Sequence, residues 1–362
     1  MAKPDDQKKP VHSMRKSYCI VGYLLIVALL VPGCLSKSAD CKQVDVFCVG
    51  LVTDVGRRDD RSYNQAAWEG VQQAKASGVV TWVASIETVD AKDYEENIKV
   101  FGEAGYDVIV TVGSAMGDAT RAAAAAYPDS YFIGVDQDQS TNQDFSSNLA
   151  GLVFPEDQIG YLAGALAAQL SKTGQIGAVC ASDASPSMKR YGEGFLAGAA
   201  YISSEVKATV TYHNEVDLDK TFDDPEWGAS KANSLVGSGT DIIFSVGGAT
   251  GNNALVIAVA LGAYAIGADT DQYYALPVAA PHLYMSVLKM IAPGIAELIK
   301  LAKKAQAGDS VFPSGNYEGQ VGLSPYHDMD SAVPDKVKAR MIELNRALLA
   351  GETQTGVSIT NP

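Results

Sequence analysis

Short apolar runs alternate with longer amphipathic segments along most of the chain. Continuous runs rich in Val and Ile, such as residues 46–52 and 108–112, predict strands that are buried on both faces. Segments between such runs carry apolar residues at helical spacing, as in residues 62–76. Parallel strands joined by right-handed helical crossovers form a doubly wound sheet, so this pattern predicts an α/β lobe. The first series of expected strands comprises residues 46–52, 80–85, 108–112 and 131–135.

The same alternation is repeated after residues 148–154, which are expected to cross into a second lobe. No linker rich in Pro or Ser separates the halves, which favours two lobes hinged by several crossing segments. We expect residues 44–150 and 271–310 to form lobe 1, and residues 151–270 and 311–362 to form lobe 2. The second series of expected strands comprises residues 175–180, 208–213, 241–246, 264–268 and 283–287. Near the end of the chain, residues 308–334 are predicted to be a polar loop.

The N-terminal segment predicts export. A basic stretch precedes an apolar run at residues 19–31; a bilayer span takes about 20 residues, and this shorter pattern is typical of a secretory signal. The run ends in the sequence VPGC at residues 31–34, which resembles a bacterial lipobox, where cleavage leaves a lipidated N-terminal cysteine. We therefore expect residues 1–34 to be a lipoprotein signal peptide, with lipidation at Cys34, and residues 35–43 to be a tether. An uncleaved anchor helix is the alternative, and both would hold an exported body at the membrane.

Length and charge narrow the class of protein further. The 362 residues suit two domains better than one core, and 47% hydrophobic residues predict a folded body. The formal net charge of −14 disfavours nucleic-acid polymers as partners, because an acidic surface repels phosphate backbones. That charge leaves a neutral small molecule open as a ligand.

Three cysteines lie beyond the lipobox, at Cys41, Cys48 and Cys180. Cys48 and Cys180 fall in predicted strands and are expected to be core thiols, although a Cys41–Cys180 disulfide stays open. No CxxC or Cys/His spacing of the zinc-binding kind is present. We therefore expect no metal and no other cofactor.

Polar residues follow several predicted strands directly, among them Asp54, Asp136 and Asp269. In open α/β sheets, ligands bind beyond the carboxyl ends of the strands, so these side chains are expected to line a cleft. Asp59 and Asp60 open a predicted helix, where a carboxylate is equally well explained as a helix cap.

A catalytic site is not expected. The glycine-rich segment 247–251 lacks the Lys-Ser/Thr ending of a phosphate-binding P-loop, so a tight turn is the simpler interpretation. None of the four histidines follows a strand beside a nucleophile, and no Gly-x-Ser-x-Gly elbow is present. These absences argue against an enzyme and in favour of a binding protein.

The segment at residues 53–70, TDVGRRDDRSYNQAAWEG, closely resembles the signature of the basic membrane protein family. Members of this family are lipoprotein substrate-binding components of ABC transporters and include the bacterial purine-nucleoside receptor. The likeness extends through GVD at residues 134–136, TGN at 250–252 and IGAD at 266–269, and covers roughly residues 45–351. The resemblance implies a type I periplasmic-binding-protein fold, in which two doubly wound parallel-sheet lobes are joined by a multi-strand hinge.

The resemblance also implies how a purine base would be held. Tyr63 matches the aromatic residue that stacks on the base, and a flat π surface suits that contact. Asn64 and Asp136 match residues that read the base edge, and Asp54 is expected to line the same cleft. Leu255 stands where the family often has a second stacking Phe, so the other side of the base would be aliphatic or supplied by another residue.

Asp269 and Lys289 match residues that hold ribose hydroxyls, because a carboxylate accepts hydroxyl protons and a nearby lysine balances its charge. The implied ligand is a purine nucleoside such as inosine, guanosine or adenosine, passed to an ABC permease from the extracytoplasmic face of the cell membrane. The alternatives are a receptor for a sugar or another ribosylated or heterocyclic solute, and a sensor or adhesion lipoprotein on the same fold.

Overall fold

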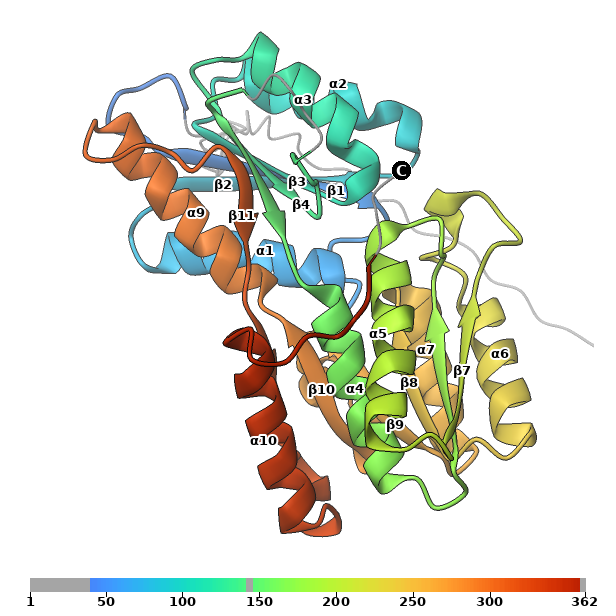
Figure 1. Ribbon diagram of the computed structural model, residues 1–362. Coiled ribbons are helices and arrows are strands. Elements are labelled where there is room, and N and C mark those ends of the chain that lie inside the picture. Colours follow the sequence, from blue (N-terminus) through green and yellow to red (C-terminus); the bar gives the residue numbers. More distant parts are fainter. Residues whose placement is uncertain (1–39, 141–145, 359–362) are drawn as a thin grey trace, which may run out of the picture. The chain divides into compact units, whose positions relative to one another are not determined.

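The computed structural model describes residues 40–140 and 146–358 of the chain, and within them the strands form two six-stranded sheets (Figure 1). The first sheet has the order β11-β5-β4-β3-β1-β2, and its strands are parallel. The bounds are β1 Cys48–Val55, β2 Trp82–Thr88, β3 Val108–Val112, β4 Tyr131–Val135, β5 Leu149–Val153 and β11 Gly315–Glu318. The first series of predicted strands is therefore confirmed, and residues 148–154 add a strand to this sheet before the chain crosses.

Helices cover both faces of the first sheet. Successive side chains of β1 point to opposite faces of the sheet, because side chains alternate along a strand. Val49 and Leu51 pack in the core under α1 and α9, whereas Val52 packs under α2 and α3. The helix bounds are α1 Tyr63–Ala76, α2 Tyr94–Glu103, α3 Gly117–Ala126 and α9 Ile291–Gln306, with short 3₁₀ helices η1 Ala91–Asp93 and η2 Ser114–Met116.

The second sheet has the order β12-β10-β9-β8-β6-β7, and only β12 is antiparallel among the pairings of the described residues. Its strands are β6 Gln175–Cys180, β7 Lys207–Tyr212, β8 Ile242–Val246, β9 Tyr264–Asp269, β10 Leu283–Lys289 and β12 Val321–Leu323. Its helices are α4 Glu156–Leu170, α5 Pro186–Ile202, α6 Pro225–Gly237, α7 Gly248–Ala260, α8 Gln272–Ala275 and α10 Asp335–Leu349, with 3₁₀ helices η3 Leu218–Lys220, η4 Ala280–His282 and η5 His327–Ala332.

Helices α4 and α5 pack closely against each other, and this contact fixes the position of α5 next to the first lobe. A Cβ at Gly160 or Gly164 would collide with backbone atoms of α5, and one at Gly194 would collide with backbone atoms of α4. Small residues at these positions therefore let the two helix backbones approach each other closely. This contact positions Ser187 and Tyr191 of α5 beside the junction of the two lobes.

Three segments connect the lobes: β5 to α4, β10 to α9, and β11 to β12. The lobe boundaries expected from the sequence are wrong at two of these crossings. Residues 271–310 were expected in lobe 1, but β10 belongs to the second sheet, and residues 311–362 were expected in lobe 2, but β11 belongs to the first. The cause is that β10 buries Met285 and Val287 in the second core, and the chain changes lobe only afterwards.

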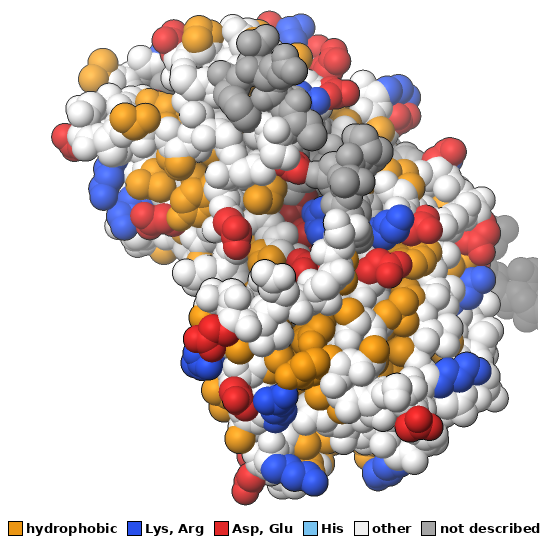
Figure 2. Space-filling view, in the orientation of Figure 1, with side chains coloured by type: hydrophobic (Ala, Val, Ile, Leu, Met, Phe, Trp, Pro, Cys, Tyr) orange, Lys and Arg blue, Asp and Glu red, His pale blue; other side chains and the backbone are white. Residues whose placement is uncertain are grey.

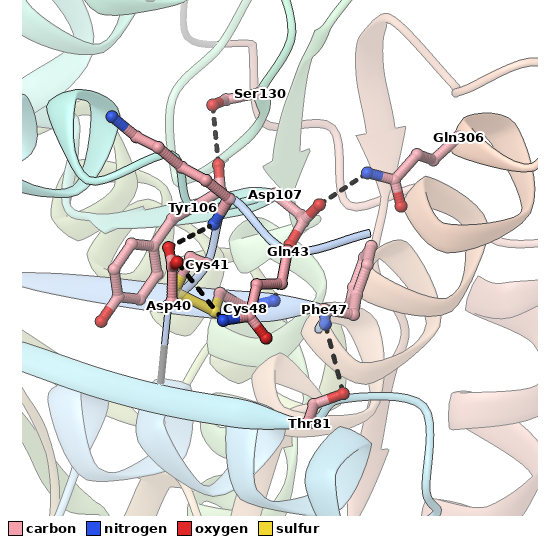
Figure 3. Close-up of a disulfide and its surroundings, with 11 residues drawn as sticks. Asp40, Cys41, Gln43, Phe47, Cys48, Thr81, Tyr106, Asp107, Ser130 and Gln306 are labelled. Atoms are coloured by element: carbon pink, nitrogen blue, oxygen red, sulfur yellow. Dashed lines mark hydrogen bonds between the residues drawn. A yellow bond between two sulfur atoms is a disulfide. The ribbon is translucent and has the colours of Figure 1, made fainter. Parts of the chain in front are cut away.

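A disulfide joins Cys41 to Cys48, at the start of the described chain (Figure 3). The expectation that Cys48 is a core thiol is therefore wrong, and so is a Cys41–Cys180 pairing; Cys180 is a buried free thiol, as predicted. The same corner is held by Asp107, which accepts hydrogen bonds from the Cys48 backbone N–H (2.6 Å) and from Gln306 Nε2 of α9 (2.6 Å). The segment that enters β1 is thus fastened to the first lobe covalently and by hydrogen bonds.

Across residues 40–140 and 146–358, no helix combines the length and apolar character that crossing a membrane requires. The predicted signal peptide and Cys34 lie outside the described residues. On the face shown in Figure 2, acidic and basic side chains are interspersed, and both kinds gather where the two lobes meet.

Candidate functional site

A cavity of about 140 Å³ lies between the two lobes, at the carboxyl ends of the strands. The first lobe contributes residues at or just beyond the ends of β1, β3 and β4, and the second contributes residues at or beyond the ends of β6, β7, β8, β9 and β10. Lining residues from the first lobe include Asp54, Asp60, Tyr63, Asn64, Gly113 and Asp136. Those from the second include Ser187, Met188, Phe222, Gly247, Asp269 and Lys289. The location agrees with the general rule for open α/β sheets.

Both lobes place residues with positive φ at the ends of strands that reach the cavity. Gly113 after β3 and Gly247 after β8 have φ of +106° and +115°, and Asp136 and Asp269 have φ of +58° and +67°. Left-handed conformations cost free energy in residues other than glycine, and aspartate is among those that tolerate them best. Each Asp carboxylate is thereby turned into the space between the lobes.

Leu255, expected to face the ligand, does not line the cavity. It is fully buried in a core cluster of α7 with Ala254 and Ala258. Only the first turn of α7 reaches the cavity, and Leu255 lies about 10 Å farther along the helix at 1.5 Å per residue. The expectation for this residue is therefore wrong.

Phe222 is the aromatic residue of the second lobe that lines the cavity, and the sequence analysis missed it. It lies in the loop between β7 and α6, flanked by Thr221 and Asp223, so no periodic pattern marks it. Thr250 of α7 holds the loop in place. Its backbone N–H donates to the Phe222 carbonyl (3.3 Å), and its hydroxyl donates to the Thr221 carbonyl (2.8 Å).

Asp54 and Asn64 form a polar pair on the first-lobe wall. Asn64 Nδ2 donates to Asp54 Oδ1 (2.8 Å), while Asn64 Oδ1 is buried without a hydrogen-bond partner among the described residues. Burial raises the pKa of Asp54 to about 7, and the Asn64 hydrogen bond only partly opposes this. The Tyr63 hydroxyl donates to the Val135 carbonyl at 3.4 Å, which orients the ring along the same wall.

Asp60 is both a helix cap and a cavity residue. Its carboxylate accepts from the backbone N–H groups of Ser62 (2.8 Å), Asn64 (2.9 Å) and Gln65 (3.1 Å), the capping role that the sequence left open. Burial nevertheless raises its pKa to about 6. Asn252 of the second lobe donates to the Asp60 carbonyl (3.0 Å), a direct link between the lobes.

Lys289 is the centre of a buried charge network. Its Nζ lies 2.6 Å from Asp136 Oδ2 and 2.9 Å from Glu156 Oε1. Glu156 also accepts from Arg190 Nε (2.7 Å). Burial opposes the charge on Lys289, but Asp136 and Glu156 outweigh it and raise the lysine pKa. Because Asp136 belongs to the first lobe and Lys289 to the second, this ion pair joins the lobes.

The expected pairing of Lys289 with Asp269 is therefore replaced by pairs with Asp136 and Glu156. Asp269 Oδ1 accepts instead from the Tyr191 hydroxyl, and burial raises the pKa of Asp269. Glu156, Arg190 and Tyr191 were missed because they lie on α4 and α5, where a polar residue in a helical pattern carries no sign of its partner. Asp136 Oδ1, like Asn64 Oδ1, is buried without a partner among the described residues.

Two α/β lobes that enclose a polar and aromatic cavity are the arrangement found in solute-binding proteins. The chain belongs to the Bmp family, whose sequence model, ABC transporter substrate-binding protein PnrA-like, matches residues 47–345. The resemblance noted in the sequence is thus confirmed, and so is the expectation that the chain is not an enzyme, because the family binds transporter substrates.

Several proteins that carry different names are similar in sequence to this chain. The ABC transporter nucleoside-binding protein BmpA of Lactococcus lactis is 30% identical over 72% of this chain and 76% of its own length. The CD4+ T-cell-stimulating antigen of Listeria monocytogenes is 28% identical over 93% of this chain and 98% of its own. Basic membrane protein A of Borreliella burgdorferi is 29% identical over 70% of this chain and 72% of its own.

Solved structures agree on the fold. A solute-binding protein of an ABC transporter system from Aeropyrum pernix superimposes with a TM-score of 0.72 at 22% identity, covering 84% of this chain and 92% of its own. Another from Conexibacter woesei gives 0.67 at 21% identity, covering 85% and 98%. The expected two-lobed α/β fold is confirmed, and the chain is an extracytoplasmic substrate-binding component of an ABC transporter.

Proposed function

We propose that the protein captures a purine nucleoside between its lobes and delivers it to an ABC permease. The observation that carries the proposal is the pair of aromatic residues in one cavity, Tyr63 from the first lobe and Phe222 from the second. A purine base placed between them would stack on both rings, and stacking is worth about 1–3 kcal/mol per base in other proteins. Closure of the lobes would complete the stack.

The polar groups beside Tyr63 fit the edge of a base. Asn64 Oδ1 and Asp136 Oδ1 are buried acceptors without partners among the described residues, so a ligand with N–H groups would satisfy both. An unsatisfied buried acceptor costs about 1–3 kcal/mol, and that cost is recovered when the ligand donates. The neutral form of Asp54, favoured by its pKa of about 7, would add a donor to the same edge.

The second lobe supplies the group that we assign to the ribose. Asp269 lines the cavity, and its Oδ1 accepts from the Tyr191 hydroxyl, which fixes the carboxylate in place. A carboxylate that accepts from two adjacent hydroxyls suits a ribose diol. Lys289 would act on this diol from a fixed position, because Asp136 and Glu156 hold its ammonium group.

The membrane attachment that we propose is a lipid on Cys34, which becomes the N-terminal residue after cleavage of the bond between Gly33 and Cys34. Support comes from the lipobox-like sequence and from the Cys41–Cys48 disulfide, because disulfides persist in exported proteins. In cells, Cys34→Ala should move the protein from the membrane fraction to the soluble one. Retention in the membrane fraction would favour the uncleaved anchor helix.

Ligand binding should be tested on residues 40–362 after unfolding and refolding, which removes any solute bound during expression. Inosine, guanosine, adenosine, the free bases and ribose are compared by thermal shift and by calorimetry. A ligand present at 100 times its dissociation constant adds about 2.7 kcal/mol to the free energy of unfolding. Stabilisation by nucleosides with none from bases or ribose supports the proposal; stabilisation by sugars alone would replace it with a sugar receptor.

A further inference from the structure

His213, which the binding site does not include, is buried at the end of β7 with both ring nitrogens on carboxylates. Its Nδ1 lies 2.7 Å from Glu215 Oε2, and its Nε2 lies 3.0 Å from Asp224 Oδ2. The ring is 1% exposed and stacks on Trp227 of α6, with centroids 4.3 Å apart and an interplanar angle of 12°. The His213 backbone N–H donates to the Ala181 carbonyl (2.6 Å), so the backbone that carries the ring is attached to the end of the neighbouring strand β6.

Glu215 and Asp224 lie at the two ends of the loop that carries Phe222, the aromatic residue that the second lobe contributes to the cavity. Residues 215 and 224 are the ends of this loop, and Leu218, Phe222 and Asp223 within it line the cavity. Asp224 has a second role, because its Oδ1 accepts from the Trp227 backbone N–H (2.9 Å) as the N-cap of α6. One imidazole ring therefore ties both ends of the loop to the sheet.

Only a doubly protonated ring can donate to both carboxylates. The hydrogen bond from His213 lowers the pKa of Glu215 to about 2. The Trp227 N–H likewise lowers the pKa of Asp224. Both acids are thus anions at neutral pH, and a neutral ring would direct a lone pair at one of them.

The other charged and titratable groups around the ring leave both Glu215 and Asp224 as anions. Lys231 of α6 pairs with Glu215 (3.4 Å) and lies 5.0 Å from the Trp227 ring centroid. Asp183, after β6, accepts from Asn214 (2.8 Å). Cys180 and Tyr212, at the ends of β6 and β7, are neutral because burial raises the pKa of each.

We propose that His213 is a positioning residue: its ring bridges Glu215 and Asp224, clamps the loop of residues 215–224 and holds Phe222 against the cavity, and through this loop it sets ligand affinity. The affinity part of this inference rests on the proposed nucleoside function, whereas the ordering of the loop does not. Loss of either contact between the ring and a carboxylate would loosen the loop, and affinity should fall because Phe222 would no longer be held against the ligand.

The test compares His213→Gln with His282→Gln as a matched control. Gln can donate to one carboxylate but cannot bridge two, and His282 hydrogen-bonds only to the Ala263 carbonyl (3.2 Å) among the described contacts, away from the cavity. In His213→Gln we expect faster amide hydrogen exchange across residues 215–224 and a roughly 5- to 30-fold weaker affinity for the best-binding nucleoside. The control should match the wild type in both. Unchanged exchange and affinity in His213→Gln would overturn the proposal.

A second variant separates the clamp from simple loss of packing. Glu215→Gln keeps the loop sequence nearly intact at a half-exposed position and weakens one of the two contacts of the ring while His213 stays in place. Amide hydrogen exchange across the loop should then be faster than in the wild type at the same pH; unchanged exchange would contradict the bridging role of the ring. If the wild type binds no nucleoside, the proposed function fails, and hydrogen exchange in the two variants still decides whether the clamp exists.

Discussion

At the scale of single residues, Phe222 lines the cavity, as the sequence suggested for Leu255, and Leu255 is buried in the core instead. Phe222→Ala should weaken nucleoside binding by about 1–3 kcal/mol, because one stacking surface is lost from the cavity. Leu255→Ala should leave affinity unchanged in the folded fraction and lower the free energy of unfolding by about 2–5 kcal/mol, because its side chain is fully buried. Calorimetry and urea unfolding of both variants measure these effects. Weakened binding in Leu255→Ala alone would restore the original assignment.

The buried carboxyl of Asp54 should make the free energy of unfolding fall as pH rises, whereas a salt-bridged acid makes it rise. Its pKa rises from 3.8 to about 7 on folding, so between these values the folded protein binds more protons than the unfolded chain. The contribution to stability is complete below pH 4 and is lost as pH rises through 7, by up to about 4 kcal/mol.

Asp54→Asn should remove this dependence, since the amide stays neutral and its oxygen can still accept from Asn64. Urea unfolding at pH 4, 6 and 8 should show a gain for the variant at pH 8 and little change at pH 4. Asp59→Asn, at an exposed neighbouring position, is the control. An equal effect of the two substitutions at pH 8 would rule out the buried carboxyl as the cause.

At the scale of elements, the α4–α5 contact depends on the absence of side chains. Gly164→Ala should destabilise the protein by about 1–3 kcal/mol, because its Cβ would collide with the Phe195 carbonyl and force the helices apart. Gly237→Ala, at the end of α6, meets no atom within 4 Å and should be neutral or stabilising by up to about 1 kcal/mol. Thermal unfolding of the two variants compares them. Equal melting temperatures would show that the helices can separate without cost.

The sequence predicts elements well where each one buries its own apolar residues. The central strands β1, β3, β4, β6, β8 and β9 are continuous apolar runs, and their periodicity is sufficient. The segment of residues 308–334 was predicted to be a loop, yet β11 and β12 form there by pairing with β5 and β10. The strand β11 is largely polar and partly exposed, and β12 has only three residues, so neither carries a recognisable strand pattern and pairing with the partner strand stabilises both.

Some residues of the candidate site could also be predicted from the local sequence, and others could not. Aspartates placed directly after apolar strands were predicted to line the cleft, and Asp54, Asp136 and Asp269 do so. The partners of Lys289 could not be predicted, because Asp136 and Glu156 come from positions 153 and 133 residues away in the chain. Which carboxylate pairs with a lysine is decided by how three crossing segments meet, and that information is not local.

At the scale of the whole molecule, the lobes are not contiguous segments, and this determines how they can fold. The first sheet is covered on one face by α1 and α9, and Ile291, Ile295 and Leu298 of α9 share a core cluster with Ala67 and Val71 of α1. In the chain, α9 is separated from strands β1 to β5 of this lobe by all strands of the second sheet except β12. The first half of the chain therefore lacks part of its own core.

We accordingly expect a fragment of residues 40–153 to be unfolded or molten, because the face under α9 would be exposed to water. Fusing residues 290–318 to it through a flexible Gly/Ser linker should restore α9 and β11 and give a cooperative unfolding transition. Circular dichroism with urea titration compares the two fragments. A cooperative transition in the shorter fragment would show that the lobe folds without α9 and β11. The cavity would then lie between two independently stable domains, and the two lobes would not need each other in order to fold.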